Sequence, residues 1–274
     1  MTSTLRVRPT KAGVARADGG GSSWWISVGT IIAIALAWEL VPRFLDDRTL
    51  FPTLSDTFAG LARLVSAGYW WSDLSSTLVS VVLAWMIGCG VGLLAGIALG
   101  TVPFIRTAIT PYAIAVQALP KIVLAPLFIG WLGFGPQSKI AIAVVICFFP
   151  VWIDTMVGLA LPSSNEFKLM QSLNATRAQI FRKLQLPSAV PMIMVGVKHA
   201  MLLAFTGVLV AEILSASAGG LGTLTKQFSS QLNMPLTFAV VIVVVIIAVT
   251  LVSIMDVIER RVVFWSEESR SRKS

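Results

Sequence analysis

Long apolar stretches constrain this chain more than any other feature of its sequence. A helix needs about 20 apolar residues to cross the roughly 30 Å hydrocarbon core of a bilayer. Six stretches are that long or nearly so, at about 24–41, 74–102, 105–131, 140–161, 190–215 and 236–258. Only 12% of the residues are charged, whereas soluble domains average about 25%. We therefore expect an all-α bundle of about six transmembrane helices in a multi-pass membrane protein.

The first stretch resembles a secretory signal peptide in one respect, since basic residues precede it. The triplet Ala35-Leu36-Ala37 also imitates a cleavage site. Because that triplet lies inside the apolar run, we interpret the stretch as an uncleaved anchor.

The placement of Lys and Arg predicts the orientation, because positively charged loops stay in the cytoplasm. With the N-terminus inside, the cytoplasmic parts are the N-tail, the turn at Arg106, the loop 162–188 and the C-tail, and they carry the whole net charge of +8. The basic excess therefore reports topology and requires no nucleic acid as a partner. We expect both termini in the cytoplasm and lipid of the cell membrane around the chain. The expected parts are the N-tail (1–23), the first span with an external segment (24–73), a membrane core (74–260) and the C-tail (261–274).

The external segment contains Phe51-Pro52 and then five apolar residues at helical spacing: Leu54, Phe58, Leu61, Leu64 and Val65. This pattern predicts an amphipathic helix that lies on the outer membrane interface. A lid that touches a substrate is the alternative.

Four glycines of the second stretch recur at every fourth position: Gly88, Gly92, Gly96 and Gly100. This spacing places them on one face of a helix, where a neighbouring backbone can approach closely. We expect helix packing there rather than a ligand site.

Residues for metal or covalent chemistry are scarce. Cys89 and Cys147 lie in apolar runs without ligand spacing, and His199 is the single histidine. We expect buried, inert thiols, with no metal, no cofactor and no catalytic residue. The glycine-rich run 215–222 lacks the spacing of a phosphate-binding loop. Any ATP chemistry must therefore reside on another chain.

Three prolines, Pro111, Pro120 and Pro126, interrupt the third stretch. Each removes a backbone donor and disturbs the preceding turn, and a broken membrane helix is tolerated where protein or a water-filled cavity satisfies the freed carbonyls. Gln117 and Lys121 lie between these prolines, and Lys121 lies about 22 Å from the cytoplasmic start of the stretch. One interpretation is a translocation path lined by Gln117, Pro120 and Lys121. The other is that Lys121 snorkels to the outer interface.

Three further charges lie within the apolar stretches. Asp154 and Lys198 both fall in the cytoplasmic half, which predicts a structural ion pair between them. Glu212 lies near the outer end of the fifth stretch, shortly before Ser215. One interpretation is that Glu212 and Ser215 line the path. The alternative for Glu212 is simple exposure at the membrane interface.

The loop 162–188 is longer than the about 2 to 8 residues that usually join helices of a bundle. Ser163-Ser164-Asn165-Glu166 offers helix-starting chemistry. Five residues then recur at helical spacing: Leu169, Leu173, Thr176, Ile180 and Phe181. We predict one short amphipathic helix, which either binds in the groove of a cytoplasmic partner or rests on lipid headgroups.

The second half of this loop has the sequence SLNATRAQIFRKLQLP (172–187). It resembles the EAA loop of ABC importer permeases, which docks into a cleft on the ATPase subunit. The usual Glu-Ala-Ala of that loop falls on Lys168-Leu169-Met170, and its glycine falls on Asn174. Asn tolerates left-handed backbone geometry better than other non-glycine residues, so we expect the turn to survive.

Further motifs cover most of 74–260: Gln117-Ala118-Leu119-Pro120-Lys121, Ala125-Pro126-Leu127, Trp131-Leu132-Gly133-Phe134-Gly135, Phe148-Phe149-Pro150-Val151 and Ala211-Glu212. They look like the nitrate/sulfonate/taurine group of these permeases. Asp154 stands where that group would have Asn.

The resemblance implies the type I importer permease fold and an importer for a small organic or inorganic anion or a heteroaromatic compound. It also implies two ATP-binding subunits, an extracytoplasmic solute-binding protein and a second permease copy, with a homodimer as the simpler guess. Movement would follow alternating access driven by the ATPases. The expected ATPase-coupling residues are Leu173, Asn174, Ala175, Thr176, Arg177, Ile180, Phe181, Leu186 and Pro187.

Two rival functions remain open on the sequence. An ATP-independent channel or secondary transporter would also use intramembrane charges and a broken helix. An intramembrane enzyme ranks last, since the stretches contain no His-rich cluster, carboxylate dyad or Ser/His pair.

Overall fold

The computed structural model describes residues 23–44, 50–68, 70–215 and 219–265, and this part of the chain is helical without strands. The predicted all-α class is therefore confirmed. Five helical segments are long and apolar enough to cross a membrane, where the sequence predicted about six: Trp25–Phe44, Trp70–Gly100, Pro136–Gly158, Arg177–Leu214 and Met234–Val262. They correspond to helices α1 (Ser23–Phe44), α3 (Trp70–Gly100), α6 (Pro136–Gly158), α9 (Leu186–Leu214) with the residues before it, and α11 (Met234–Val262).

The third apolar stretch accounts for the difference. It divides into α4 (Pro103–Ala118), a 3-10 turn η1 (Lys121–Leu124) and α5 (Ala125–Leu132). Leu119, which precedes Pro120, has an extended backbone with ψ of 136°, as the ring of the following proline demands. The span predicted over 105–131 is therefore not one continuous helix, and the interruption predicted at its prolines is confirmed between Ala118 and Lys121.

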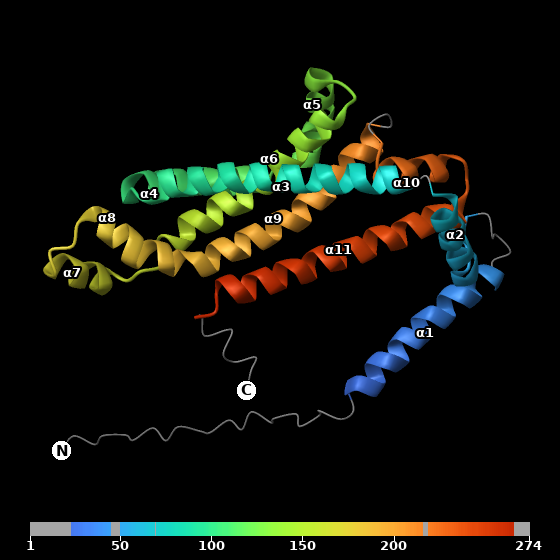
Figure 1. The fold of residues 1–274 in the computed structure, drawn as a ribbon, viewed down its shortest axis with the longest axis horizontal. Coiled ribbons are helices and arrows are strands. Elements are labelled where there is room, and N and C mark those ends of the chain that lie inside the picture. The colour runs from blue at the N-terminus through green and yellow to red at the C-terminus, as the bar shows by residue number, and fades with distance from the viewer. Residues whose placement is uncertain (1–22, 45–49, 69, 216–218, 266–274) are drawn as a thin grey trace, which may run out of the picture.

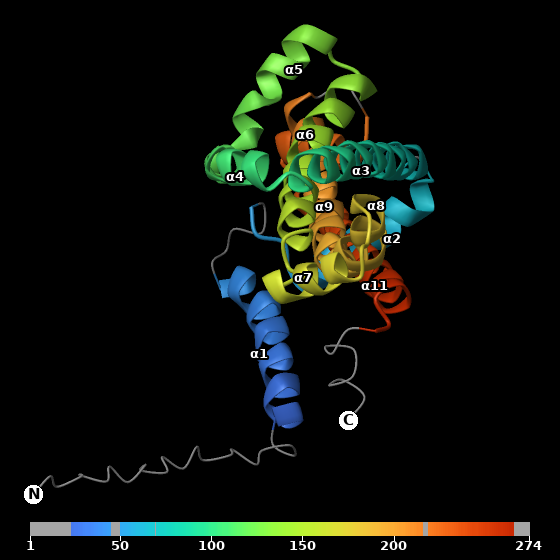
Figure 2. The same ribbon diagram turned by 90° about the vertical axis from the view of Figure 1, so that its left-hand side faces the viewer.

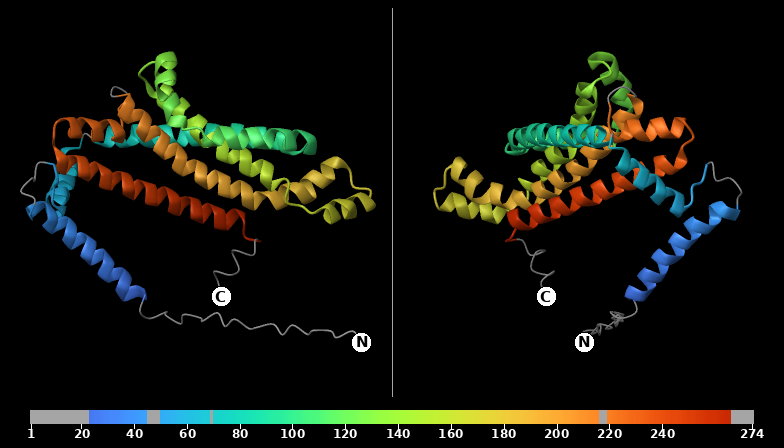
Figure 3. Two further views of the ribbon diagram at one scale, coloured as in Figure 1. Left: turned by 180° about the vertical axis from the view of Figure 1, so that it is seen from behind. Right: turned by 45° about the vertical axis from the view of Figure 1, so that its right-hand side comes forward.

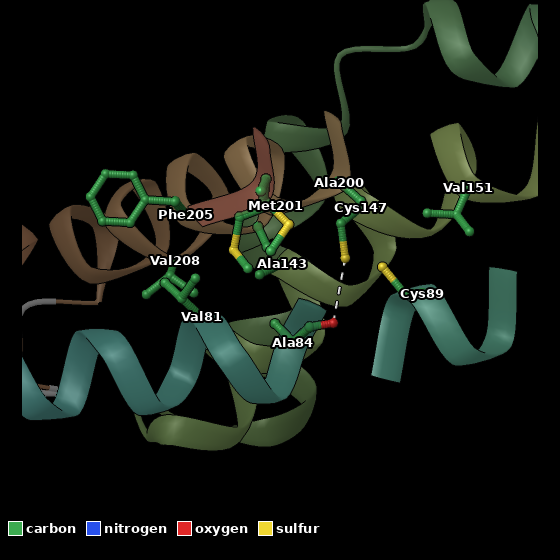
Figure 4. Packing of buried hydrophobic residues seen from close by; sticks show 12 residues of the cluster. Val81, Ala84, Cys89, Ala143, Cys147, Val151, Ala200, Met201, Phe205 and Val208 are labelled. Carbon is green, nitrogen blue, oxygen red and sulfur yellow. Dashed lines mark hydrogen bonds between the residues drawn. The ribbon is translucent and has the colours of Figure 1, made fainter. Parts of the chain in front are cut away.

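Helices α3, α6 and α9 form the core of the bundle, and α11 packs against α9. Figure 4 shows apolar side chains of the three core helices, from alanine to phenylalanine in size, in one cluster, with Cys147 Sγ donating to the Ala84 carbonyl at 3.4 Å. Cys89 and Cys147 are both buried and free, as predicted.

The four spaced glycines of α3 lie along its contact with α6. A Cβ on Gly92 would lie 2.9 Å from the Phe148 carbonyl oxygen, and one on Gly96 would lie 2.5 Å from Thr155 Cβ. Gly88 faces Cys147, and Gly100 faces Met156 and Leu159. Larger residues would push the two helices apart, which is the close approach that the spacing predicted.

The bundle has two distinct ends. The start of α4, helices α7 (Ser164–Ser172) and α8 (Arg177–Ile180), and the C-terminal end of α11 gather at one end, and α2 (Leu54–Ala67) and α10 (Leu221–Ser230) lie at the other (Figures 1 and 3). Helix α1 contacts α2 and, through the rings of Trp38 and Phe238, α11, and otherwise stands apart, on the side of the bundle opposite α5 (Figures 1 and 2).

The amphipathic helix predicted in the external segment is α2. A capping box between Thr53 and Asp56 starts it, and Gly68 ends it in a left-handed conformation. Its Leu64 is fully buried against α10 and α11, whereas Phe58 and Val65 are exposed. The helix therefore packs on protein with one face, which the simple interfacial interpretation did not include.

Candidate functional site

The loop 162–188 begins with a well-capped short helix. Ser163 Oγ accepts a hydrogen bond from the Glu166 backbone N–H at 3.4 Å, and the Glu166 carboxylate accepts one from the Ser163 N–H at 2.5 Å. This reciprocal capping box satisfies two donors that the first turn of α7 would otherwise leave open. The helix-starting role predicted for this tetrapeptide is thus confirmed.

A left-handed residue ends this helix. Asn174 has φ of +52°, and the Ala175 N–H reaches back to the Met170 carbonyl at 3.0 Å. Asn is the non-glycine residue that best accepts this geometry, so the turn persists where the related loops have glycine. One amphipathic helix through this loop, as predicted, is wrong: the turn at Asn174 separates two helical segments.

The second segment is continuous with the longest helix of the bundle. Thr176 and Gln179 form another capping box that starts α8, and a π-helical stretch η2 (Phe181–Gln185) leads directly into α9. The Leu186 N–H donates to the Phe181 carbonyl, five residues back. Pro187 has no N–H and would clash with the preceding turn of a regular helix, and a π-bulge is a common accommodation. Leu186 and Pro187 therefore do not end the loop but belong to a helix from Arg177 to Leu214.

The surface of this loop combines exposed and anchored apolar groups. Leu169 and Leu173 are 61% and 69% exposed. Phe181 packs instead against a buried cluster of Leu159, Ala189 and Ile193. The remaining coupling candidates are half-buried (Ala175, Ile180 and Leu186) or exposed (Asn174, Thr176, Arg177 and Pro187). The loop thus presents two leucines outward while its second segment is fixed to the bundle.

A buried ion pair lies at the opposite end of the bundle. Lys139 of α6 and Glu212 of α9 have fully buried side chains, with 3.0 Å between Lys139 Nζ and Glu212 Oε1. Lys139 Nζ also donates to Ser76 Oγ at 2.9 Å and to the Gly219 carbonyl at 3.2 Å. Burying two charges costs several kcal/mol per ion unless such bonds compensate. Glu212 is therefore not exposed at the interface, and Lys139 was not among the predicted site residues.

The carboxylate of Glu212 is surrounded by donors from two further elements. Thr77 Oγ1 lies 3.0 Å from both of its oxygens, and the Gly222 N–H donates to Oε2 at 2.9 Å. Leu221 N–H donates to Thr77 Oγ1 at 2.9 Å, and Gly220 N–H donates to Asp73 at 2.7 Å. The backbone of 219–222 thus forms an anion-binding turn for the protein's own carboxylates. We call Asp73, Ser76, Thr77, Lys139, Glu212 and Gly219 to Gly222 the buried network.

The glycines of this turn explain why the run is glycine-rich. Gly219 and Gly220 have φ of +65° and +119°, and a Cβ on Gly220 would collide with the Glu212 carboxylate. This close approach is the signal that the sequence offered: a carboxylate followed by Gly-Gly-x-Gly. Residues 216–218 of the run lie outside the described residues.

The other path candidates lie apart from the buried network. Lys121 begins η1 and places its ammonium 5.1 Å from the ring centroid of Phe149 on α6, which is cation–π distance. Pro120 precedes it with an exposed ring, and Gln117 lies within α4 with its side chain outside the described residues. Ser215 is buried at the end of α9, and its Oγ has no hydrogen-bond partner among the described residues.

The predicted ion pair between Asp154 and Lys198 is wrong. Lys198 bonds instead to Asp256 and to Glu259, the latter at 3.2 Å, both on α11. Asp154 lies against Gly196 of α9, where a Cβ would be 2.9 Å from Asp154 Cβ. The prediction paired the two residues because they lie at similar depth on neighbouring helices. Lys198, however, lies on the face of α9 that is turned toward α11.

Comparison with known proteins places this geometry in a family. Residues 88–264 match the binding-protein-dependent transport system inner membrane component. The formylaminopyrimidine transport permease protein ThiX of Halalkalibacterium halodurans is 30% identical over 66% of this chain and 74% of its own length. The riboflavin transport system permease protein RibX of Chloroflexus aurantiacus is 32% identical over 59% of this chain and 60% of its own length. The taurine transport system permease protein TauC of Escherichia coli is 29% identical over 65% of this chain and 64% of its own length.

Two solved structures share the fold. An inward-facing structure of the methionine ABC transporter MetNI has a TM-score of 0.55 at 23% identity, covering 70% of this chain and 93% of the other. The crystal structure of an amino acid ABC transporter with histidines has a TM-score of 0.60 at 16% identity, covering 73% and 97%. The described helices therefore have the arrangement found in the membrane subunits of such transporters.

Proposed function

This chain belongs to the family of binding-protein-dependent transport system inner membrane components, the permease subunits of ABC importers, and we propose that its loop 162–188 receives the force of ATP hydrolysis from separate ATPase subunits. The permease is a membrane subunit without enzymatic activity of its own, since the ATPase of these importers is a separate subunit. The proposal covers how this chain couples to the ATPase, where the solute passes through it and which subunits it assembles with.

The geometry of the loop carries the proposal. Leu169 and Leu173 are exposed at the end of the bundle, and two capped helical segments hold the turn between them in one shape. Exposed leucines on a helix that projects beyond the bundle suit the helix-in-groove mode of recognition.

Helix α9 supplies the route by which a movement of the loop reaches the membrane. The segment from Arg177 to Leu214 is continuous through its π-bulge, and Phe181 ties its start to the cluster of Leu159 and Ala189. A push on α8 would therefore move α9 as one body. Rigid-body movement of this kind is the usual means of alternating access.

The solute path is proposed to follow the broken third stretch. Gln117, Pro120 and Lys121 would line it near the break between α4 and α5, and Ser215 would contribute at the outer end. Lys121 favours an anion over a cation by simple Coulomb attraction. The buried side chain of Glu212 acts in this proposal as a support of the path, since it has no exposed surface in the described conformation.

The assembly would contain two copies of this permease, two ATPases on the side of the loop and an extracytoplasmic solute-binding protein on the side of α2 and α10. The names of these relatives give formylaminopyrimidine, riboflavin and taurine as their solutes. A small organic or inorganic anion or a heteroaromatic compound is the corresponding proposal here. With the loop on the cytoplasmic side, both termini face the cytoplasm.

Uncoupling tests this proposal directly. In proteoliposomes containing the complete importer, Thr176→Ala with Arg177→Ala should remove solute uptake while ATP hydrolysis continues, because the cap of α8 and its first charge are lost. Thr250→Ala with Arg261→Ala, at exposed positions of α11, is the matched control and should leave uptake unchanged. Uptake that persists in the double variant would contradict a coupling role for α8.

An ATP-independent channel or transporter is the rival function, and co-purification separates the two. The chain expressed with its genomic neighbours should retain a nucleotide-binding subunit through detergent extraction. Solute flux through the chain alone, without any ATPase, would favour the rival.

A further inference from the structure

The turn between α10 and α11 holds a leucine in a backbone conformation that leucine rarely adopts. Leu232 has φ of +55°, in the left-handed region, where a bulky side chain is an outlier. Its N–H donates to the Ser229 carbonyl at 3.0 Å, and the Asn233 N–H donates to the Phe228 carbonyl at 2.9 Å. These two bonds form a Schellman motif, in which glycine is the usual left-handed residue. A leucine at this position is therefore costly.

Packing within the chain does not account for this leucine. The side chain of Leu232 is 58% exposed, so its burial offsets little of the backbone strain. The other non-glycine residue with positive φ in the described part of the chain is Asn174, and asparagine tolerates that geometry. Strain that the fold does not compensate is typical of functional positions. A contact outside the chain would account for Leu232.

The turn lies at the end of the bundle away from α7 and α8 (Figure 1). Met234 begins the last membrane-spanning segment, so Leu232 lies just beyond that span. The side chains around it are exposed and polar: Lys226, Gln227, Ser229, Ser230, Gln231 and Asn233. An apolar centre within a polar rim is the usual anatomy of a surface that binds another protein. A surface immersed in the membrane interface would carry more aromatic and apolar side chains.

Helix α10 holds this turn on a firm support. The Gly222 N–H in its first turn donates to Glu212 Oε2 at 2.9 Å, and its Leu224 and Phe228 are buried in a cluster shared with α2, α3 and α11. The surface therefore has its shape before a partner arrives, which lowers the ordering cost of binding. A force on the turn would reach α9 through Glu212.

We propose that Leu232 is the anchor on which the extracytoplasmic solute-binding protein docks, with its side chain entering an apolar recess of that protein. The description of the family names a binding protein on which transport depends, and this is a soluble partner of the required kind. The polar side chains of α10 would form hydrogen bonds around the recess, and Lys226 adds one positive charge to the rim. The inference rests on the proposed assembly, in which that protein lies on the side of α2 and α10, and narrows the contact to one turn.

Docking on the complete importer tests the inference. The chain is expressed with its genomic neighbours, the complex of permease and ATPase is placed in nanodiscs, and the Kd of the purified solute-binding protein is measured by biolayer interferometry. Leu232→Asn, which suits the left-handed backbone and removes the apolar group, should raise this Kd about tenfold. Leu232→Met, which keeps an apolar side chain of similar volume, should retain most of the affinity. Leu161→Asn, at a leucine that is 57% exposed at the opposite end, is the matched control and should leave the Kd unchanged.

Thermal unfolding of the same complexes separates a docking role from a structural one. Because asparagine relieves the strained backbone, the midpoint of the Leu232→Asn complex should be no lower than that of the unmodified complex. A midpoint that falls together with the affinity would mean that the leucine supports the fold, and would overturn the inference.

An unchanged Kd in Leu232→Asn would overturn it as well, since the leucine would then contact lipid or nothing. The same holds if mass photometry shows a change in the number of permease copies while the Kd stays the same, because the turn would then face a second copy. A complex that binds the solute-binding protein equally well with either side chain refutes the anchor alone. An unmodified complex that keeps its ATPase but binds no solute-binding protein refutes the proposed assembly together with the anchor.

Discussion

The two ion-pair clusters that involve α9 differ in burial and in the number of their partners. Lys139 and Glu212, at the end of α9 near α10, have 0% exposed side chains and share bonds with α3, α6 and the glycine turn. Lys198, in the half of α9 near the loop, is 32% exposed, and its partners Asp256 and Glu259 are 37% and 32% exposed. One cluster is enclosed within the chain, and the other is partly exposed on its surface.

With one pair of each kind, a helix can be fixed at one end and free to move at the other. Removing one member of a buried pair leaves an uncompensated charge, whereas a half-exposed pair can separate and be solvated at little cost. We therefore expect α9 to be fastened where Glu212 meets Lys139. The end that carries Lys198 can shift against α11, which is the end that the proposed coupling loop would move.

The largest expected effect comes from Lys139→Met. This change leaves Glu212 buried without its counter-ion, and we expect the free energy of unfolding to fall by about 3–5 kcal/mol. Urea titration in a neutral detergent, followed by circular dichroism, measures it.

The double change Lys139→Met with Glu212→Met is the control. Replacing both charges by apolar groups of similar volume removes the unpaired carboxylate, so the double variant should unfold at a higher urea concentration than Lys139→Met alone. A double variant that loses as much as the sum of both single changes would contradict the sealed-pair interpretation.

A smaller effect is expected for Thr77→Val, which keeps the shape and removes one hydroxyl of the buried network. The Glu212 carboxylate loses a donor and the Leu221 N–H loses its acceptor. An unsatisfied buried group costs about 1–3 kcal/mol, and the same urea titration should detect it.

The matched control is Thr206→Val on α9, because the Thr206 hydroxyl donates only within its own helix, to the Leu202 carbonyl, and is exposed. Its expected change is near zero. Equal losses in the two variants would show that the network adds nothing to the pair itself.

The contrast between the clusters also marks what the sequence could predict. Local patterns predicted the glycine face of α3, the cap at Ser163 and the left-handed turn at Asn174, because each depends on residues within a few positions. The pairing of charged residues on different helices could not be predicted from such local patterns. Lys139 and Glu212 are 73 residues apart, and Asp154 and Lys198 differ in the helix faces that they present.

The broken third stretch shows the same limit in another form. Proline chemistry predicted that the helix is interrupted between Pro111 and Pro126, because the missing N–H acts locally. The placement of Lys121 over Phe149 depends on how α6 passes the break, and no local pattern states it. Buried sites built from several helices therefore need the fold before their residues can be grouped.

The smallest expected effect is that of Lys198→Met. Exposed ion pairs contribute about 0–1 kcal/mol, and water can solvate the half-exposed Asp256 and Glu259 once Lys198 is gone. The urea midpoint should shift little, and added salt should reduce the remaining difference because it screens exposed charges. Lys139→Met should stay destabilised at all salt concentrations, since its site is sealed. A large, salt-independent loss in Lys198→Met would remove the distinction between the two clusters and with it the argument that α9 is fastened at one end only.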